Sequence, residues 1–172
     1  VTISNLTTLK TIRSRVLLLF VFMFMTMKLS ASFILVPMDE KQKNQLEIAA
    51  LAHDIGKSLI PEEILAKPTP LTKNEYKLEN LHANLGADII QQLGFDQSIC
   101  DAVRYHHMPY RYFINNPEKY LTARILCVAD AFAAMLSGRP YREPRPKEQV
   151  LKELSKYSGF QFDPKIVELA HS

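Results

Sequence analysis

Residues 46–57 of this 172-residue chain read LEIAALAHDIGK, and this stretch decides the fold. It predicts a helix that is apolar on almost every face, so we expect it to be buried in a helical domain. Near its end it carries His53 next to Asp54. A buried carboxylate is unfavourable by several kcal/mol unless a metal, a partner or hydrogen bonds compensate it. The pair therefore predicts either a metal site, since imidazole and carboxylate suit divalent transition metals, or a buried His–Asp hydrogen bond.

Lys57 follows the pair closely enough that a continued helix places it on the same side as His53 and Asp54. A cation at that position would hold a substrate phosphate. The simpler interpretation is that Lys57 caps the end of the helix.

The composition bounds the class of protein. The length suits one ordinary domain, and 47% hydrophobic with 23% charged residues is typical of a globular one. The net charge of +3 arises in residues 1–37, which contain basic side chains and no acidic one. A basic balance confined to one segment does not indicate nucleic-acid binding, so we expect no nucleic-acid polymer as a partner. Cys100 and Cys127 lack zinc-like spacing, which indicates reduced thiols and a cytoplasmic protein.

Residues 1–37 differ from the rest, and we divide the chain into this segment and a domain over residues 38–172. Val16–Met27 is apolar apart from Thr26, with basic residues before it. The layout is that of a signal peptide, or of a membrane anchor over residues 16–36. A buried helix, or the remains of a truncation, is the alternative. Of the two membrane-related alternatives, we expect an anchor rather than a cleaved signal.

The next long helix is predicted between Thr72, which forms a capping box with Glu75, and Gly94. Its expected inner stripe consists of large apolar residues: Leu78, Leu81, Leu85, Ile89 and Leu93. His82 lies between two members of that stripe and is expected to face inward, as a core residue or as a ligand.

Two further helices carry polar residues with metal-binding chemistry. One starts after Asp96 and ends in His106-His107, where adjacent side chains splay and can reach one site. The other, Tyr120–Leu136, is strongly apolar but contains Asp130, whose carboxylate needs a cation, a metal or a proton. Short helices are expected after Pro61, over Pro146–Tyr157 and over Pro164–Ala170, the last capped by Asp163. With no strand pattern, the prediction is an all-α bundle.

Six residues at inward or helix-end positions share N or O donor chemistry, and together they predict a metal centre. They are His53, Asp54, His82, His106, His107 and Asp130. Six such ligands suit two octahedral ions bridged by one carboxylate.

With these residues in place, the chain over residues 46–170 resembles the HD superfamily of metal phosphohydrolases, and within it the HD-GYP branch of bacterial cyclic di-GMP phosphodiesterases. The matching segments are 49–57 (AALAHDIGK), 60–65 (IPEEIL), 67–68 (KP), 71–72 (LT), 82–87 (HANLGA), 106–107 (HH), 123–132 (ARILCVADAF), 139–142 (RPYR) and 160–164 (FQFDP). The resemblance implies an HD-type helical bundle and metal-ligand roles for the six residues named above. It also implies iron or manganese as the ions, phosphate contacts from Lys57, Arg139 and Arg142, and a role in signal transduction.

The resemblance further implies that metal-activated water hydrolyses a cyclic dinucleotide, with Asp54 bridging the ions and Lys57 neutralising the phosphate. Two features depart from the family pattern. Such domains usually carry a further His ligand on an earlier helix, whereas residues 1–52 contain no histidine. The Gly-Tyr-Pro signature after the paired histidines is absent, and Met108–Tyr120 replaces it. A catalytically degenerate module that binds a nucleotide or a signalling partner protein is therefore the alternative.

Overall fold

The computed structural model describes residues 36–137 and 143–171, which form seven α-helices and three short 3-10 helices and contain no strand. The helices are α2 (Glu40–Ala52), η2 (Ile55–Leu59), α3 (Glu62–Leu65), α4 (Lys73–Gln92), α5 (Gln97–Tyr105), η3 (Tyr110–Tyr112), η4 (Glu118–Tyr120), α6 (Leu121–Ser137), α7 (Lys147–Lys156) and α8 (Pro164–Ala170). The predicted all-α fold is confirmed.

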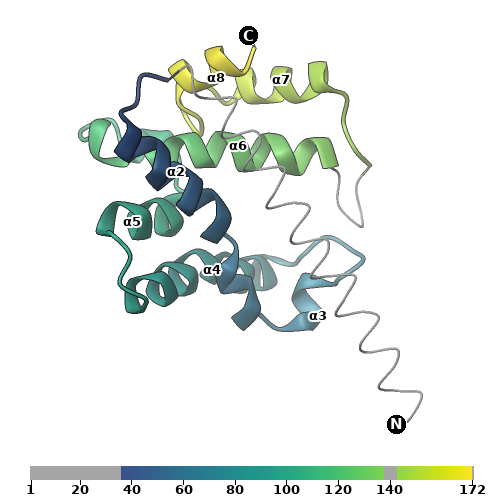
Figure 1. Cartoon of the computed structure of the whole chain (residues 1–172). Coiled ribbons are helices and arrows are strands. Elements are labelled where there is room, and N and C mark those ends of the chain that lie inside the picture. The colour runs from purple at the N-terminus through teal and green to yellow at the C-terminus, as the bar shows by residue number, and fades with distance from the viewer. Residues whose placement is uncertain (1–35, 138–142, 172) are drawn as a thin grey trace.

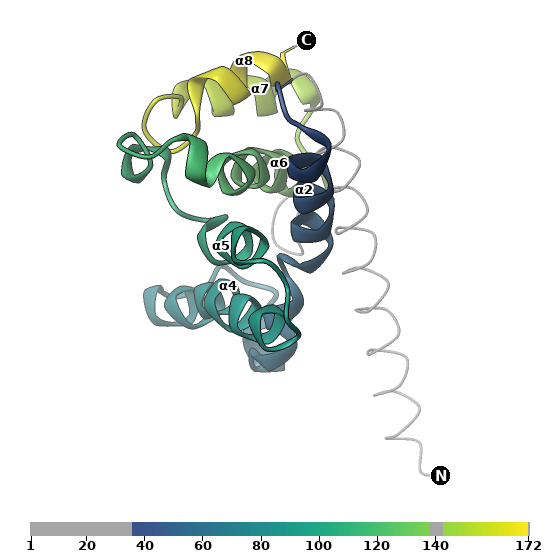
Figure 2. The ribbon, with the colours of Figure 1, turned by 60° about the vertical axis from the view of Figure 1, so that its left-hand side comes forward.

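The helices are arranged around α6. Helices α7 and α8 pack on one side of α6, while α5 packs on the other side and carries α4 beneath it (Figure 1). Helix α2 runs across this arrangement and contacts both α5 and α6, as the rotated view also shows (Figure 2). The turn after α2 therefore comes to lie between the α4–α5 pair and α6.

Two apolar clusters meet at α6. One joins α6 to α7 and α8 through large side chains such as Ile125, Leu154 and Ile166. The other joins α2, α4 and α5 and contains many alanines, including Ala49 and Ala87. Small side chains let helix backbones approach closely, so the polar residues on these helices are brought near one another.

Several predicted helix ends are confirmed. Thr72 and Glu75 form a capping box at the start of α4, and Gly94 takes a φ of 83° after its end. Asp163 caps α8 by accepting a hydrogen bond of 2.9 Å from the Lys165 amide. Asp96 occupies the N-cap position of α5, but its side chain makes no capping hydrogen bond.

The predicted leucine stripe of α4 is wrong. Leu78 and Leu81 are each 46% exposed and Leu93 is 67% exposed. The buried face consists instead of His82, Ala83, Gly86, Ala87 and Ile90. Helix α4 packs closely against η2 and α5, and small residues permit that approach where leucines would hold the helices apart. His82 is buried as predicted, but not because it lies between members of a buried leucine stripe.

Helix α2 is shorter and less buried than its sequence predicts. It ends at Ala52, with His53 at the C-cap, and Leu51 is 43% exposed. Its buried side is formed by Leu46, Ala49 and Ala50. The sequence predicts that this helix ends near Gly56, whereas the chain already changes direction after Ala52 and enters η2 at Ile55.

One helical stretch in the described part of the chain, Glu118–Ser137, is long and apolar enough to span a membrane by composition alone, and about two thirds of it is buried within the fold (67%). It contains α6, the central helix. The expected apolar segment over residues 1–37, with its anchor at 16–36, lies almost wholly outside the described residues, so that division remains a prediction.

Candidate metal centre

Three histidines are held in the same way. The Nδ1–H group of each donates to the backbone carbonyl three residues earlier: His53 to Ala50 at 2.8 Å, His82 to Glu79 at 2.6 Å, and His106 to Val103 at 2.6 Å. Each bond fixes the orientation of its ring and favours the tautomer with the proton on Nδ1. The Nε2 atoms are then free to act as donors to a metal.

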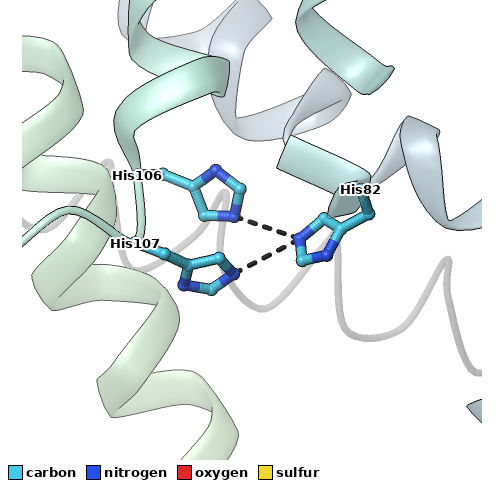
Figure 3. A group of neighbouring side chains, drawn as sticks. All are labelled: His82, His106 and His107. Atoms are coloured by element: carbon cyan, nitrogen blue, oxygen red, sulfur yellow. Dashed lines mark hydrogen bonds between the residues drawn. The ribbon is translucent and has the colours of Figure 1, made fainter. Parts of the chain in front are cut away.

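The imidazoles of α4 and of the end of α5 face one another. His82 Nε2 lies 3.4 Å from His106 Nε2 and 3.3 Å from His107 Nε2 (Figure 3). Burial lowers the pKa of His82, helped by the charge of Lys57, and burial also lowers the pKa of His106 well below its ordinary value. Two neutral rings in this tautomer turn nitrogen lone pairs toward each other, an arrangement that a cation between them would stabilise.

Two carboxylates complete this cluster. Asp54 places Oδ2 3.5 Å from His53 Nε2 and Oδ1 3.4 Å from His82 Nε2. Asp130, on α6, places Oδ1 3.6 Å from His53 Nε2 and Oδ2 4.0 Å from His107 Nδ1. Burial acts to raise the pKa of both carboxyl groups. The positive groups around them, His53 first for both, then Lys57 for Asp54 and His107 for Asp130, together outweigh burial, so both pKa values lie well below the ordinary range.

His53 provides a direct test of whether a metal fits. Its Nε2 atom is fully buried and has no hydrogen-bond partner, because the two carboxylates around it lie beyond hydrogen-bonding distance. Burial lowers the pKa of His53, but Asp54 and Asp130 raise it further, so that the net pKa is above its ordinary value. A positive charge next to His53 Nε2 is therefore favourable. A divalent metal bound by imidazole and carboxylate ligands would supply it.

Lys57 lies beside the carboxylate pair. Its Nζ atom is 2.6 Å from Asp54 Oδ2. Burial acts to lower the pKa of Lys57, but the charges of Asp54 and Asp130 and the hydrogen bond to Asp54 together raise it by more, so the net pKa lies above its ordinary value. The η2 turn keeps Lys57 on the side of Asp54 that the sequence predicted from a continued helix.

Gly56 explains why this turn can lie so close to α4. A Cβ atom at Gly56 would come within 2.0 Å of the His82 carbonyl oxygen and 2.6 Å of the Gly86 amide nitrogen. Such overlap is not tolerated, so only glycine permits this approach. The approach brings Asp54 and Lys57 from η2 and its preceding turn to His82 on α4.

The structure thus brings together seven residues that the sequence singled out: His53, Asp54, Lys57, His82, His106, His107 and Asp130. Arg139 and Arg142, predicted to contact phosphate, lie outside the described residues. His107 is the most exposed of the four imidazoles at the centre, with 39% of its side chain accessible. Solvent or a substrate can therefore approach from the His107 side.

Glu79 was missed by the sequence analysis. Its Oε1 atom lies 3.8 Å from His82 Nδ1, and only 12% of its side chain is exposed. The signal that would have found it is its position three residues before His82, which places both side chains on one face of α4.

Comparison with known proteins identifies the family. The family model described as HD domain matches residues 26–166. This chain belongs to the HD-domain family. HD domains bind divalent metals, which agrees with the histidine cluster of His82, His106 and His107, whose potential ligand atoms lie within 4.8 Å of one another.

The relatives of this HD domain are cyclic-dinucleotide phosphodiesterases by name, which confirms the resemblance to the HD-GYP branch. A cyclic di-GMP phosphodiesterase of Thermotoga maritima is 34% identical over 76% of this chain and 38% of its own length. The cyclic di-GMP phosphodiesterase response regulator RpfG of Xanthomonas campestris is 33% identical over 76% of this chain and 36% of its own. A 3'3'-cGAMP-specific phosphodiesterase of Vibrio cholerae is 28% identical over 76% of this chain and 26% of its own. The chain thus spans less than two fifths of the length of these relatives.

Proposed function

We propose that this chain is a metal-dependent phosphohydrolase domain of the HD-GYP type, which hydrolyses a phosphodiester bond of a cyclic dinucleotide, cyclic di-GMP. The observation that carries the proposal is the convergence of four imidazoles and two carboxylates, from α4, α6 and the ends of α2 and α5, on one largely buried point. The names of the relatives support the substrate class.

The proposed ligands are His53, Asp54, His82, His106, His107 and Asp130, and we propose two ions, iron or manganese. When bound, such ions lower the pKa of water and neutralise charge that develops on phosphate oxygens. Asp54 is the proposed bridging ligand, since its two oxygens face different imidazoles at 3.5 and 3.4 Å. The backbone carbonyls that accept from the Nδ1–H groups would hold the rings in place and increase the basicity of Nε2.

Lys57 and the two arginines are proposed to bind the phosphate. The Lys57 ammonium is part-buried beside Asp54, where a low dielectric strengthens its attraction to an anionic substrate oxygen. Arg139 and Arg142 follow α6 in the sequence and would contact the phosphate at the open side of the centre. The open side is the one on which His107 is accessible.

A second candidate is a catalytically degenerate HD domain that binds a nucleotide or a signalling partner without hydrolysis. The lack of any histidine in residues 1–52 favours it, because one ligand of the family pattern is missing. The substituted segment Met108–Tyr120 favours it as well, because the Gly-Tyr-Pro signature is absent.

Hydrolysis of cyclic di-GMP by the full chain, loaded anaerobically with Mn²⁺ or Fe²⁺ and followed by chromatography, tests the proposal. We expect turnover in the wild type and none in Asp54→Asn. Arg139→Ala should weaken nucleotide binding measured by calorimetry by roughly 1.5–3 kcal/mol, the scale of a charged hydrogen bond, without unfolding the domain. Binding without turnover in the wild type supports the second candidate. Absence of both metal and nucleotide binding contradicts the hydrolase and the nucleotide-binding candidate, and leaves a domain that binds a signalling partner protein.

A further inference from the structure

His107 differs from the other three imidazoles of the centre in how its ring is held. His53, His82 and His106 each donate from Nδ1 to a backbone carbonyl three residues earlier. In the described parts of the chain, the Nδ1 atom of His107 has no such bond, and it lies 4.0 Å from Asp130 Oδ2, beyond hydrogen-bonding distance. The position of this ring therefore depends on the backbone that carries it.

The backbone after His107 is attached to the turn between α7 and α8. The Tyr110 amide donates to the Gln161 carbonyl at 2.9 Å, and the Arg111 amide donates to the Phe160 carbonyl at 3.2 Å. These bonds join segments that lie far apart in the sequence. Because His107 comes shortly before Tyr110, while α5 holds the chain on its other side, the two bonds restrain the backbone of His107 from both directions.

A side-chain contact reinforces these backbone bonds. The guanidinium carbon of Arg111 lies 4.1 Å from the centre of the Phe160 ring. At this distance a cation is attracted to the face of an aromatic ring. Both side chains are exposed, Phe160 to 54%. A ring that is half exposed adds little to a core, so the contact mainly holds the segment after His107 against the turn.

We propose that the contact between Arg111 and Phe160 positions His107 for metal binding, so that both are positioning residues that act through the backbone. The inference rests on the proposed function, because it assumes that the centre binds metal. It gives a task to the segment Met108–Tyr120, which stands in place of the Gly-Tyr-Pro signature. It also makes the turn between α7 and α8 part of the support of the centre.

The metal affinity of variants at exposed positions tests the inference without recourse to activity. Mn²⁺ binding to the full chain is measured by calorimetry for the wild type, Phe160→Ala, Phe160→Tyr and the control Ile114→Ala, which shortens an exposed apolar side chain of the same segment. In Phe160→Ala we expect the Mn²⁺ affinity to fall by about 10-fold, the lower end of the range for groups that orient metal ligands. Phe160→Tyr keeps an aromatic face next to Arg111, so it should bind Mn²⁺ within about 2-fold of the wild type, as should the control.

Coupling to His107 separates positioning from a merely structural role. In a His107→Ala background, Phe160→Ala should change the remaining Mn²⁺ affinity by less than about 2-fold, because two substitutions that act through one ligand are not additive. For the same reason, Arg111→Ala combined with Phe160→Ala should weaken binding no more than either substitution alone. The Tm of metal-free Phe160→Ala should stay within about 4 °C of the wild type, because the side chain is exposed.

The outcomes distinguish this inference from the proposed function. Wild-type protein that binds Mn²⁺, with Phe160→Ala binding it equally tightly, contradicts the inference alone, and so does an equal loss of affinity with and without His107. If His107→Ala binds no Mn²⁺, Phe160→Tyr decides, and a loss as large as that of Phe160→Ala contradicts the inference. Wild-type protein that binds no Mn²⁺ contradicts both proposals. A Phe160→Ala protein that is unfolded by circular dichroism contradicts the inference, because the side chain is then required for the fold.

Discussion

Helix α6 carries one member of each of two buried charged groups, and the groups differ in what completes them. Arg124 pairs with Asp163 and also donates to the Pro117 carbonyl at 2.8 Å. Asp163 in turn accepts from the Lys165 amide at 2.9 Å. Apart from the Arg124 Nε atom, which has no partner among the described residues, this group finds its hydrogen bonds and its countercharge within the protein.

The second group contains Asp130 on the same helix, and the protein does not complete it. His82 Nε2 faces two other imidazole nitrogens, and His53 Nε2 has no hydrogen-bond partner. A buried polar group completed by the protein supports the fold, whereas one left with converging lone pairs and carboxylates is suited to an external cation. The contrast indicates a structural role for Arg124 and Asp163 and supports the metal-binding role proposed for the histidine cluster.

The largest effect on the stability of the metal-free protein is expected for the group of Arg124 and Asp163. Arg124→Met leaves the carboxylate of Asp163 buried without its partner, so the free energy of unfolding should fall by about 3–5 kcal/mol. Denaturant unfolding of the metal-free protein measures this change. The double variant with Asp163→Asn should be less unstable than the sum of the two single variants, because each substitution removes the same interaction.

A smaller loss of stability is expected at Gly56, where the fold and the centre both depend on the contact between η2 and α4. Gly56→Ala forces η2 away from α4, because its Cβ would overlap the His82 carbonyl. The free energy of unfolding should fall by about 1–3 kcal/mol, the range for overpacking, and metal binding should be weaker. Gly159→Ala is a control outside the centre that is strained by its φ of 80° and not by overlap, since its Cβ would meet no atom closer than 4.0 Å, so it should leave metal binding unchanged. If Gly56→Ala binds metal as the wild type does, the approach of η2 to α4 is not what assembles the site.

A still smaller effect on stability is expected inside the centre. His106→Leu replaces a fully buried ring with an apolar side chain and removes one of the facing lone pairs. The free energy of unfolding of the metal-free protein should change by less than about 1.5 kcal/mol, as for other core substitutions that preserve volume. Mn²⁺ affinity should fall by about 10-fold or more. A destabilisation as large as that of Arg124→Met would erase the distinction between the two groups.

The pH dependence of the metal-free protein gives the smallest expected change. The pKa values of His82, His106 and His107 lie below their ordinary value of 6.5, so below that pH the unfolded chain binds more protons than the folded one. Stability from these three groups is present above pH 6.5 and is lost as the pH falls. His53 acts in the opposite sense, because its pKa is raised. The free energy of unfolding should therefore fall by about 1 kcal/mol from pH 7 to pH 5, measured by urea unfolding. Stability that rises on acidification would contradict it.

The helices of this protein were largely predictable, because their signals are local. The capping box of Thr72 and Glu75, the cap at Asp163 and the apolar run around Asp130 each specify an element within a few residues. The buried face of α4 was not predictable from apolar periodicity, because close packing against η2 selects small residues such as Gly86 over the larger leucines. The end of α2 was missed because the run of apolar residues continues past Ala52, while the approach to α4 requires a turn there.

The candidate site was predictable because its residues have unusual chemistry for their positions. His53, Asp54 and Asp130 interrupt apolar helices, and the structure places them together. Glu79 was not found, since a glutamate on a helix with many polar residues gives no such contrast. Its significance depends on which face of α4 is buried, and that face was predicted wrongly. The roles of Arg139 and Arg142 remain predictions.

The central claim is that an external cation completes the histidine cluster, and the thermal unfolding of the full chain with and without Mn²⁺ tests it most directly. Stabilisation by a ligand follows its concentration relative to Kd and reaches about 2.7 kcal/mol at 100 times Kd. We predict a Tm that rises with Mn²⁺ and saturates in the wild type, and that does not respond in Asp54→Ala. A wild-type Tm independent of Mn²⁺ across this range, in protein that also contains no metal by elemental analysis, would contradict the claim.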